Sequence, residues 1–436
     1  HLVFSSRLAY NSGMLDIKYI REHASEVAEN AKNKGYTIDV EHILELDSQR
    51  RDLVGKAEGI RAKRNNLSKG GAPSQEDIVV GKVLREELTV VDEKLTRVDS
   101  ELAELLRSVP NMALGNVPVG TSEDDNQVVK TVGSKSTFAF TPKSDAELGV
   151  ERNFIDKDRA AKVTGARFAY LTGNIVKLQF AIIQMTLDIL ADEAVIARLI
   201  QENNLSLKST PFTPVLPPAL VRTEPYRASG RLDADEVTYK LADDDLWLNA
   251  SAEHSLCTMY MNEMLAEEQL PVRMIGYSTS FRREAGSYGK DTEGIFRMHQ
   301  FDKLEMEVFS TGETGLEEHK LLVALQEYLV SQLELPYQLL QKCTADIGKP
   351  NAQGMDINTW MPAQGEYRET HTADYMTDYQ ARSLATKVKR ADGQTEFVHT
   401  NDATAFALGR IMKAILENHQ QADGGVRVPE ALQKYY

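Results

Sequence analysis

The sequence predicts an α+β protein, in which an N-terminal antiparallel coiled-coil hairpin of helices precedes a domain built on an antiparallel sheet flanked by helices. Apolar residues recur in steps of three and four over residues 43–67 and again over 84–105, as the seam of paired helices requires. Later in the chain, strand-like segments are mostly linked as hairpins, which favours antiparallel pairing. The sequence contains no Gly-x-Gly-x-x-Gly or Walker loop, so neither common parallel-sheet nucleotide fold is supported.

The composition is that of a soluble globular protein. The chain has 436 residues, 42% of them apolar and 26% charged, which is enough for two or three domains. No apolar run approaches the roughly 20 residues that cross a bilayer, so we predict no membrane partner. The two cysteines, Cys257 and Cys343, lie far apart and outside any Cys-x-x-Cys pattern, which favours a reducing, cytoplasmic location. A net charge of -15 argues against a protein that coats nucleic acid, but it allows a local basic patch to bind one.

The N-terminal region is expected to consist of helices. Residues 1–13 begin without Met and are interpreted as a vector-derived extension, with an organelle-targeting fragment as the alternative. A short helix is predicted over residues 14–35, ended by Gly35. The long seam helix follows, and after the break at residues 69–73, Ser74 is predicted to cap its partner. Arms of ~30 residues would be about 45 Å long.

The charge distribution and a segment rich in Pro and Gly define the domains that we expect. Residues 50–70 carry seven Lys or Arg side chains against two acids, which favours contact with a polyanion; a solvated coiled-coil flank is the alternative. A Pro- and Gly-marked connector then separates the hairpin from the second domain. The predicted boundaries are an arm over residues 14–110, a linker over 111–126 and a second domain over 127–436.

The second domain is predicted to alternate helices with short strands. Helices are expected over residues 174–201, 317–335 and 403–419, and a turn at 251–253 is expected to lead into a helix ending near Leu265. Strands are expected over residues 212–221 (broken by prolines), 246–248, 336–343, 355–361, 367–369, 381–389 and 396–399.

The stretch over residues 278–309 carries the most chemistry. Arg282 and Glu284 are two residues apart, so in a strand they would point to the same face. The guanidinium can bind a phosphate or carboxylate, and the carboxylate can bind an amine. With a polar loop between the strands and Phe301 on the return strand, this hairpin would suit a nucleotide held between ring and guanidinium. A charged surface hairpin is the alternative.

Six strings in a fixed order identify a family resemblance. FRREAG, SYGKDTEG, RMHQFDKLE, YRETHT, TDYQAR and ALGR resemble the bacterial type of seryl-tRNA synthetase, a class II aminoacyl-tRNA synthetase, and the resemblance covers residues 14–436. FRRE with the Phe301 strand resembles motif 2, residues 215–221 resemble motif 1 and residues 407–410 resemble motif 3. The resemblance implies ATP and Mg²⁺ as cofactors, L-serine and tRNA(Ser) as substrates, and a homodimer. It leaves open whether tRNA(Sec) is also charged.

The resemblance also implies roles for individual side chains. Catalytic roles fall to Arg282, Glu284 and Arg410. The residues expected to contact ATP are Arg282, Arg283, Glu284, Met298, Phe301, Glu369, Thr370, His371, Thr372 and Arg410. The oxygen ligands expected for Mg²⁺ are those of Glu369 and Thr372. The residues expected to contact serine are Ser251, Ala252, Glu253, Arg282, Glu305 and Thr404. The residues expected to contact tRNA are Arg50, Arg61, Lys63 and Arg64.

The sequence departs from the family pattern mainly in the serine pocket. The family usually has Thr-Ala-Glu at residues 251–253, Ile-Ser-Ser-Cys-Ser-Asn at 370–375 and Asn-Gly-Ser-Gly at 402–405. Because an amide is lost at Asp402 while His371 is gained, we hypothesise that these two side chains pair. The altered pocket also keeps open a synthetase for another amino acid. Two further alternatives are a paralogue without ligase activity, disfavoured by the intact Arg282 and Arg410, and a ligase for a carrier protein, disfavoured by the basic hairpin.

Overall fold

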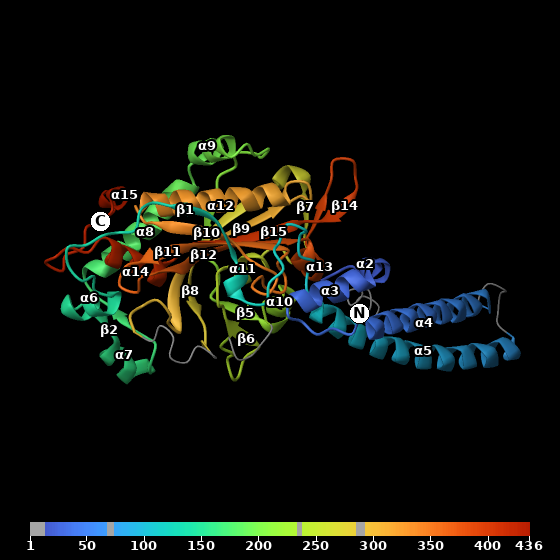
Figure 1. Ribbon diagram of the computed structural model, residues 1–436. Helices are drawn as coiled ribbons and strands as arrows, with labels where there is room; N and C mark the ends of the chain where they lie inside the picture. The colour runs from blue at the N-terminus through green and yellow to red at the C-terminus, as the bar shows by residue number, and fades with distance from the viewer. Residues whose placement is uncertain (1–13, 68–73, 233–237, 285–292) are drawn as a thin grey trace. The chain divides into compact units, whose positions relative to one another are not determined.

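The computed structural model describes residues 14–67, 74–232, 238–284 and 293–436 (Figure 1). Its contacts divide the chain into two compact units, one ending at Met112 and the other spanning Ala113–Tyr436. Residues 1–13, which are predicted to be an extension, the break over 69–73 and most of the polar loop after Glu284 lie outside the described residues.

The first unit is helical. Its helices are α2 (Ile17–Glu22), α3 (Ala24–Asn33), α4 (Val40–Leu67) and α5 (Gln75–Ser108). The single helix predicted over residues 14–35 is wrong in one respect, because the backbone of His23 leaves the helical region (φ -127°) and separates α2 from α3. Gly35, at φ +78°, follows α3 in the left-handed conformation that ends helices readily.

Helices α4 and α5 form the predicted antiparallel hairpin. Ala57 and Ile60 of α4 and Leu84 and Leu88 of α5 make one buried apolar cluster, as the three-and-four spacing predicts. Ser74 caps α5 by a reciprocal box with Asp77, and both of its hydrogen bonds are present. The 28 residues of α4 correspond to a helix about 42 Å long.

An eight-stranded sheet forms the centre of the second unit. Every neighbouring pair of strands in it is antiparallel except β4 with β8. This confirms the predicted antiparallel architecture. In spatial order the strands are β1 (Gln127–Val132), β10 (Tyr337–Gln341), β11 (Gln353–Met361), β12 (Glu366–Thr377), β15 (His399–Ala407), β9 (Gln300–Ser310), β8 (Val272–Phe281) and β4 (Thr213–Val215).

The two faces of this sheet differ in chemistry. Helix α12 (Gly315–Gln332) runs along one face, against β9, β12 and β15 (Figure 1). Leu304, Met306 and Val308 of β9 belong to the same buried apolar cluster as α12. Because side chains alternate along a strand, the intervening Glu305 and Glu307 point to the opposite face. That opposite face carries the polar residues of the site described below.

Shorter elements surround the sheet. Helix α8 (Asn174–Leu190) packs against both α14 (Leu408–Asn418) and α15 (Glu430–Gln433). The other elements are α6 (Asp145–Glu151), β2 (Ile155–Asp156), α7 (Lys157–Thr164), β3 (Tyr170–Leu171), α9 (Glu193–Glu202), β5 (Leu220–Arg222), α10 (Thr223–Ala228), β6 (Leu246–Leu248), α11 (Glu253–Leu256), β7 (Met264–Ala266), α13 (Tyr379–Leu384), β13 (Lys387–Lys389), β14 (Thr395–Phe397) and the 3-10 turns Glu123–Asp125 and Glu267–Gln269.

Several predicted boundaries are wrong. The predicted helix over residues 403–419 begins as strand β15, which pairs with β9, and becomes helical only at Leu408. The predicted strand over 381–389 is the end of α13 followed by β13. The helix expected to reach Leu265 is the four-residue α11, and the one over 174–201 is split where Asp192 caps α9.

Two further expectations concern burial and membranes. Both cysteines are free and buried, as packing residues usually are. None of the helices in the described part of the chain combines the length and the apolarity that a bilayer crossing requires.

His319 of α12 makes the fold sensitive to acid. It is 1% exposed, and neither ring nitrogen has a hydrogen-bond partner among the described residues. Burial lowers the pKa of His319 from 6.5 to about 4. Between these values the unfolded chain binds a proton that the folded chain does not, so stability is lost as pH falls from about 6.5 towards 4. Between pH 7 and pH 5, we expect the His319→Leu variant to lose about 2 kcal/mol less free energy of unfolding than the parent.

Urea titrations followed by tryptophan fluorescence measure this difference, because both tryptophans, Trp247 and Trp360, lie in the second unit. The exposed His42 provides the control, since its hydrogen bond to Glu101 raises its pKa and so acts in the opposite direction. His42→Gln should therefore lose at least as much free energy of unfolding as the parent between pH 7 and pH 5. An equal loss for His319→Leu and the parent would contradict the prediction.

Candidate active site

One wall of the site is built on the β8–β9 pair. Arg282 directly follows β8, and its backbone N–H donates to the carbonyl of His299 at 2.9 Å. Its side-chain Nε donates to the carbonyl of Ala250 at 3.2 Å, and its guanidinium lies 5.4 Å from the centre of the Phe301 ring. Burial and the nearby Arg410 lower the pKa of Arg282. The guanidinium is therefore fixed in place, and the nearby carboxylates of Glu284, Glu369 and Glu305 only partly offset the effects of burial and Arg410 on its pKa.

Arg410, in the first turn of α14, forms the opposite wall. Its Nη1 donates to Glu369 Oε1 at 2.8 Å, and its guanidinium lies 5.0 Å from the centre of the Phe296 ring. Burial would raise the pKa of Glu369, but Arg410 and Lys342 outweigh burial and lower it to about 2. The first turn of α14 can lie close to the backbone of Ile295 because residue 409 is glycine, since a Cβ there would lie 2.4 Å from the carbonyl oxygen of Ile295.

A cavity between these walls brings together most of the predicted ATP residues. Its lining includes Arg282, Glu284, Met298, Phe301, Glu369, Thr370, Thr372 and Arg410. Arg283 and His371 are not part of the lining. The Arg283 guanidinium lies 5.9 Å from the Tyr239 ring, while His371 is buried and its Nδ1 lies 2.8 Å from the Thr370 hydroxyl. Burial lowers the pKa of His371 to about 3, so the ring is neutral.

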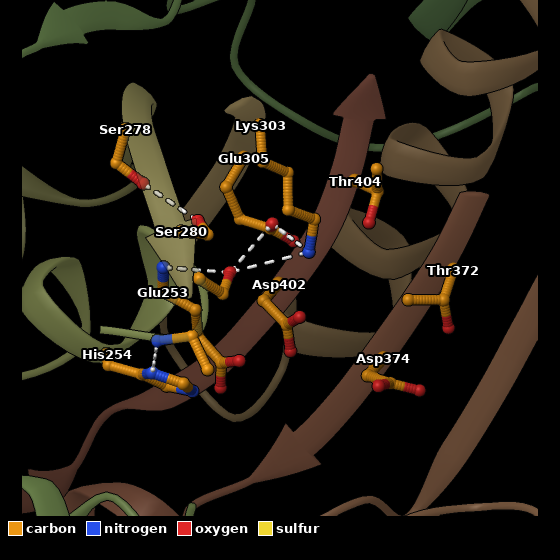
Figure 2. A network of polar contacts seen from close by, with 12 residues as sticks. Glu253, His254, Ser278, Ser280, Lys303, Glu305, Thr372, Asp374, Asp402 and Thr404 are labelled. Carbon is orange, nitrogen blue, oxygen red and sulfur yellow. Dashed lines mark hydrogen bonds and ion pairs between the residues drawn. The ribbon is translucent and has the colours of Figure 1, made fainter. Parts of the chain in front are cut away.

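The predicted serine pocket adjoins this cavity, and Figure 2 shows its polar network. The Ser251 hydroxyl donates to Glu305 Oε2 at 2.9 Å, and the Lys303 ammonium pairs with the same carboxylate. Burial raises the pKa of Glu305, although Lys303 partly offsets that effect. Glu305 Oε1 is buried and has no hydrogen-bond partner among the residues that the structure describes. One oxygen is thus anchored, and the other can accept from a ligand.

Glu253, at the start of α11, is also anchored through one of its oxygens. Its Oε1 accepts from Arg231 Nε at 2.6 Å and from Gln380 Nε2 at 3.1 Å. The segment around Ala252 can lie close to β8 because residue 276 is glycine. A Cβ on Gly276 would lie 3.1 Å from the Cβ of Ala252. The adjacent His254 accepts from the backbone N–H of Ala250 at 3.1 Å, and burial keeps the pKa of His254 well below its usual value.

The pairing hypothesised for His371 and Asp402 is wrong. Asp402 accepts from Arg231 Nη2 at 3.0 Å, while His371 bonds to its neighbour Thr370. Arg231 also lies 3.9 Å from Asp374, which faces Asp402 across the β12–β15 pair. The buried carboxylate at residue 402 is therefore compensated by an arginine from the loop after α10. Thr404, two residues further along β15, stands opposite Glu305 of β9.

The oxygen donors near Glu369 suit a hard divalent cation. Thr372 Oγ1 and Asp356 Oδ1 are buried without hydrogen-bond partners in the described ranges, although the Lys342 ammonium lies 3.7 Å from Asp356 Oδ1; the two residues face each other across β11 and β12. Burial raises the pKa of Asp356 to about 7, with Lys342 acting in the opposite direction. Among the described residues no three His, Cys, Asp or Glu side chains are arranged to hold a metal by themselves. This donor set therefore fits Mg²⁺ that takes further ligands from phosphates and water.

Comparisons with known proteins place this site in a family. A model of the seryl-tRNA synthetase N-terminal domain matches residues 14–113, and a model of the class II tRNA synthetase core domain (G, H, P, S and T) matches residues 237–419. Serine–tRNA ligases of Exiguobacterium sp. and Deinococcus radiodurans are each 37% identical to this chain, over 97% of its length and 97% of theirs. The chain belongs to the seryl-tRNA synthetase family.

Solved structures of seryl-tRNA synthetases agree with this assignment. The synthetase of Pyrococcus horikoshii, complexed with ATP, is 35% identical, with a TM-score of 0.86 over 97% of this chain and 98% of that one. The cytoplasmic serine–tRNA ligase of Naegleria fowleri, in complex with AMP, is 25% identical, with a TM-score of 0.82 over 97% and 96% of the two chains. The predicted class II synthetase fold and family resemblance are thereby confirmed.

Several side chains in this synthetase site were missed by sequence reasoning. Lys303 alternates with Glu305 along β9, so its proximity to the pocket could have been inferred from strand periodicity. Phe296, which lies beneath the Arg410 guanidinium, and Asp356, which faces Thr372, gave no comparable signal. Arg231 was missed because only the folded chain brings its loop to Glu253 and Asp402.

Proposed function

We propose that this chain activates L-serine with ATP to form seryl-adenylate and then transfers serine to the 3′ end of tRNA(Ser). The observation that supports this best is the continuity of the two predicted subsites. Lys303 and Thr404 line the same cavity as Arg282 and Arg410, and Lys303 pairs with Glu305. A nucleotide phosphate and a small amino acid bound there would be neighbours.

The first step needs positioning and charge stabilisation rather than a protein nucleophile. A serine carboxylate oxygen forms a bond to the α-phosphorus, the bond from that phosphorus to the bridging oxygen breaks, and pyrophosphate leaves. Arg282 is placed to neutralise charge on the α-phosphate and to align the carboxylate. Phe301 offers a face for the adenine, with Arg410 on the opposite wall. In the second step a ribose hydroxyl of the tRNA attacks the serine carbonyl, and AMP leaves.

Serine recognition is proposed to rest on one oxygen each of Glu253 and Glu305. The second oxygen of Glu253 is proposed to bind the ammonium group, and Glu305 Oε1 to accept from the side-chain hydroxyl. Alanine would leave Glu305 Oε1 buried and unpaired, which is far more costly than the loss of an apolar contact. The Ser251 hydroxyl, which replaces the threonine usual in the family, keeps the donor that orients Glu305.

We propose that Glu369 and Thr372 hold Mg²⁺ together with phosphate oxygens of ATP. When bound, the ion would neutralise phosphate charge. The Arg410 guanidinium, which pairs with Glu369 in this structure, would then be available to a terminal phosphate.

We further propose a homodimer formed through residues 215–221, since β4 is an edge strand and Leu216 is 82% exposed. The cytoplasmic relative from Naegleria fowleri supports a cytoplasmic location.

Amino-acid-dependent exchange of pyrophosphate into ATP tests the proposed function. All twenty amino acids should be assayed with purified chain, ATP and Mg²⁺, and serine is expected to give the highest kcat/KM. A stronger response to another amino acid would overturn the proposed specificity. An absence of exchange with every amino acid would overturn the proposed ligase activity.

The hairpin of α4 and α5 is proposed to bind tRNA(Ser) through the basic side chains of α4. Lys63 is exposed, whereas Arg50 and Arg61 form ion pairs with Asp99 and Asp92 of α5 at 2.7 and 2.9 Å. The Arg50 pair is largely buried, so its main effect in this structure is to join the two helices.

Replacing Lys63 and Arg64 together with alanine is expected to raise the KM for tRNA about tenfold and to weaken its salt dependence, because two phosphate contacts are lost. Serine-dependent pyrophosphate exchange should stay within about twofold of the parent, since that reaction needs no tRNA. A double alanine variant of Lys94 and Arg97, exposed on α5, is the matched control. Equal loss of both activities would refute this division of labour.

A further inference from the structure

We propose that Arg231 is a positioning residue of the serine pocket. It fixes one oxygen of Glu253 and neutralises Asp402, so that the other Glu253 oxygen is presented to the substrate ammonium. This inference rests on the proposed function, and it assigns a role to a loop arginine that lies outside the synthetase motifs in the sequence.

The contacts of Arg231 support this role directly. Its Nε lies 2.6 Å from Glu253 Oε1, and its Nη2 lies 3.0 Å from Asp402 Oδ1 and 3.9 Å from Asp374 Oδ2. The Arg231 side chain is 17% exposed, and the three carboxylates are 4–8% exposed. A single guanidinium thus meets three buried acids, two of them within hydrogen-bond distance.

The sheet explains why this arginine is needed. Asp374, Asp402 and Glu307 stand in one row across β12, β15 and β9. Like charges directly opposite each other destabilise a sheet, and the cost is greater without water. Both oxygens of Glu307 are buried and lack hydrogen-bond partners in the described part of the chain, and burial raises the pKa of Glu307 well above its usual value. Burial therefore disfavours a charge on Glu307, and burial also raises the pKa of Asp402, an effect that the neighbouring Arg231 opposes.

The arrangement is built before any substrate arrives. Arg231 follows Gly230, whose positive φ of +77° turns the chain after α10 towards the sheet. Gln380 Nε2 donates both to the carbonyl of Ser229 and to Glu253 Oε1, each at 3.1 Å, and its Oε1 accepts from the Thr400 hydroxyl at 2.8 Å. The loop and the carboxylate are thus held by the same side chain. Glu253 Oε2 takes no part in these bonds and is left for a cationic ligand.

The test compares Arg231→Gln with the parent in the pyrophosphate-exchange assay, varying serine and ATP separately. We expect the KM for serine to rise at least about tenfold, because Glu253 loses a charge-assisted anchor and Asp402 is left uncompensated. The KM for ATP should change by less than about twofold. Arg231→Lys keeps the charge but cannot bridge two carboxylates, so an intermediate rise is expected.

The Arg231→Gln, Asp402→Asn double variant separates positioning from general damage. It removes the arginine together with the buried carboxylate that the arginine compensates. The rise in log KM for serine is therefore expected to be at most about half of that in Arg231→Gln alone. Arg390→Gln is the matched control, since Arg390 also contacts three carboxylates but none belongs to the pocket. Its KM for serine should equal that of the parent.

The outcomes distinguish this inference from the proposed function. If the parent shows no serine-dependent exchange, the proposed function fails. If the parent is active and Arg231→Gln leaves the KM for serine unchanged, or raises the KM values for serine and ATP equally, the positioning role fails. A lower KM for serine in Arg231→Gln would also overturn it, because the arginine would then be competing with the substrate.

Discussion

Replacing Arg282 with alanine is expected to lower the rate of serine-dependent pyrophosphate exchange by about 10³-fold, the upper range for removing one fixed charge-stabilising donor. The guanidinium lies between the carbonyl of Ala250 and the ring of Phe301, so it does not have to reorganise when substrates bind. Burial and the neighbouring Arg410 lower its pKa, and a bound α-phosphate would oppose both effects. Both kcat and kcat/KM should fall.

A lysine at residue 282 provides the sharper comparison. Lys retains the positive charge but cannot offer two parallel donors to a phosphate and a carboxylate, so Arg282→Lys is expected to retain less than about a tenth of the parental rate. Arg390→Ala, whose ion pairs lie outside the cavity, should keep the parental rate. Unfolding curves for each variant check that the fold is intact. Near-parental exchange by Arg282→Ala would remove this arginine from the mechanism.

The parts of the fold that the sequence predicted well have strong local signals. The heptad seam needs only the spacing of apolar residues, and the cap at Ser74 needs only Asp77 three residues later. The segment from Ala403 to Ala407 has no such signal, since alanines favour a helix while pairing with β9 makes them a strand. Its true state depends on a partner strand almost a hundred residues away in sequence.

The residues of the site also fall into those that a local pattern places together and those that only the folded chain brings together. The Arg282 wall and the Phe301 face follow from the alternation of side chains within one hairpin, so the sequence placed them together correctly. The partner of Asp402 could not be found in this way. His371 is close to it in the motif order, but on the folded sheet Asp402 is compensated by Arg231, which arrives from a different loop. The partner of a buried charge is determined by which side chains the tertiary structure brings close to it. Spacing along the chain does not identify this partner.

The two halves of the site therefore have different physical requirements. The ATP half uses arginine side chains and aromatic rings that face a cavity. In the proposed complex, the ligand supplies the negative charge and the base that these groups bind. The serine half uses buried carboxylates, each held on one oxygen by the protein, and the second oxygen of Glu305 is buried without a hydrogen-bond partner among the described residues. Selectivity in such a pocket comes from the cost of leaving the open oxygen unpaired, so it should respond to changes in charge more than to changes in size.

Glu305→Gln tests that principle and is expected to reduce the preference for serine over alanine by about 10²-fold, measured as the ratio of kcat/KM values in pyrophosphate exchange. Glutamine has nearly the same shape but is neutral, so an unpaired oxygen at this site costs less when alanine binds. Serine activation itself should fall strongly, because the hydroxyl loses a charged acceptor and Lys303 loses its buried partner.

The uncompensated Lys303 could obscure this result, so the double variant Glu305→Gln, Lys303→Met is the necessary companion. It removes both charges of the pair and should fold as stably as the parent or nearly so, since replacing a whole buried ion pair costs far less than breaking one. Its serine preference should still be low, because the charged acceptor is absent. If the double variant discriminates serine from alanine as well as the parent does, then Glu305 is a structural partner of Lys303, and the hydroxyl must be recognised elsewhere in the cavity.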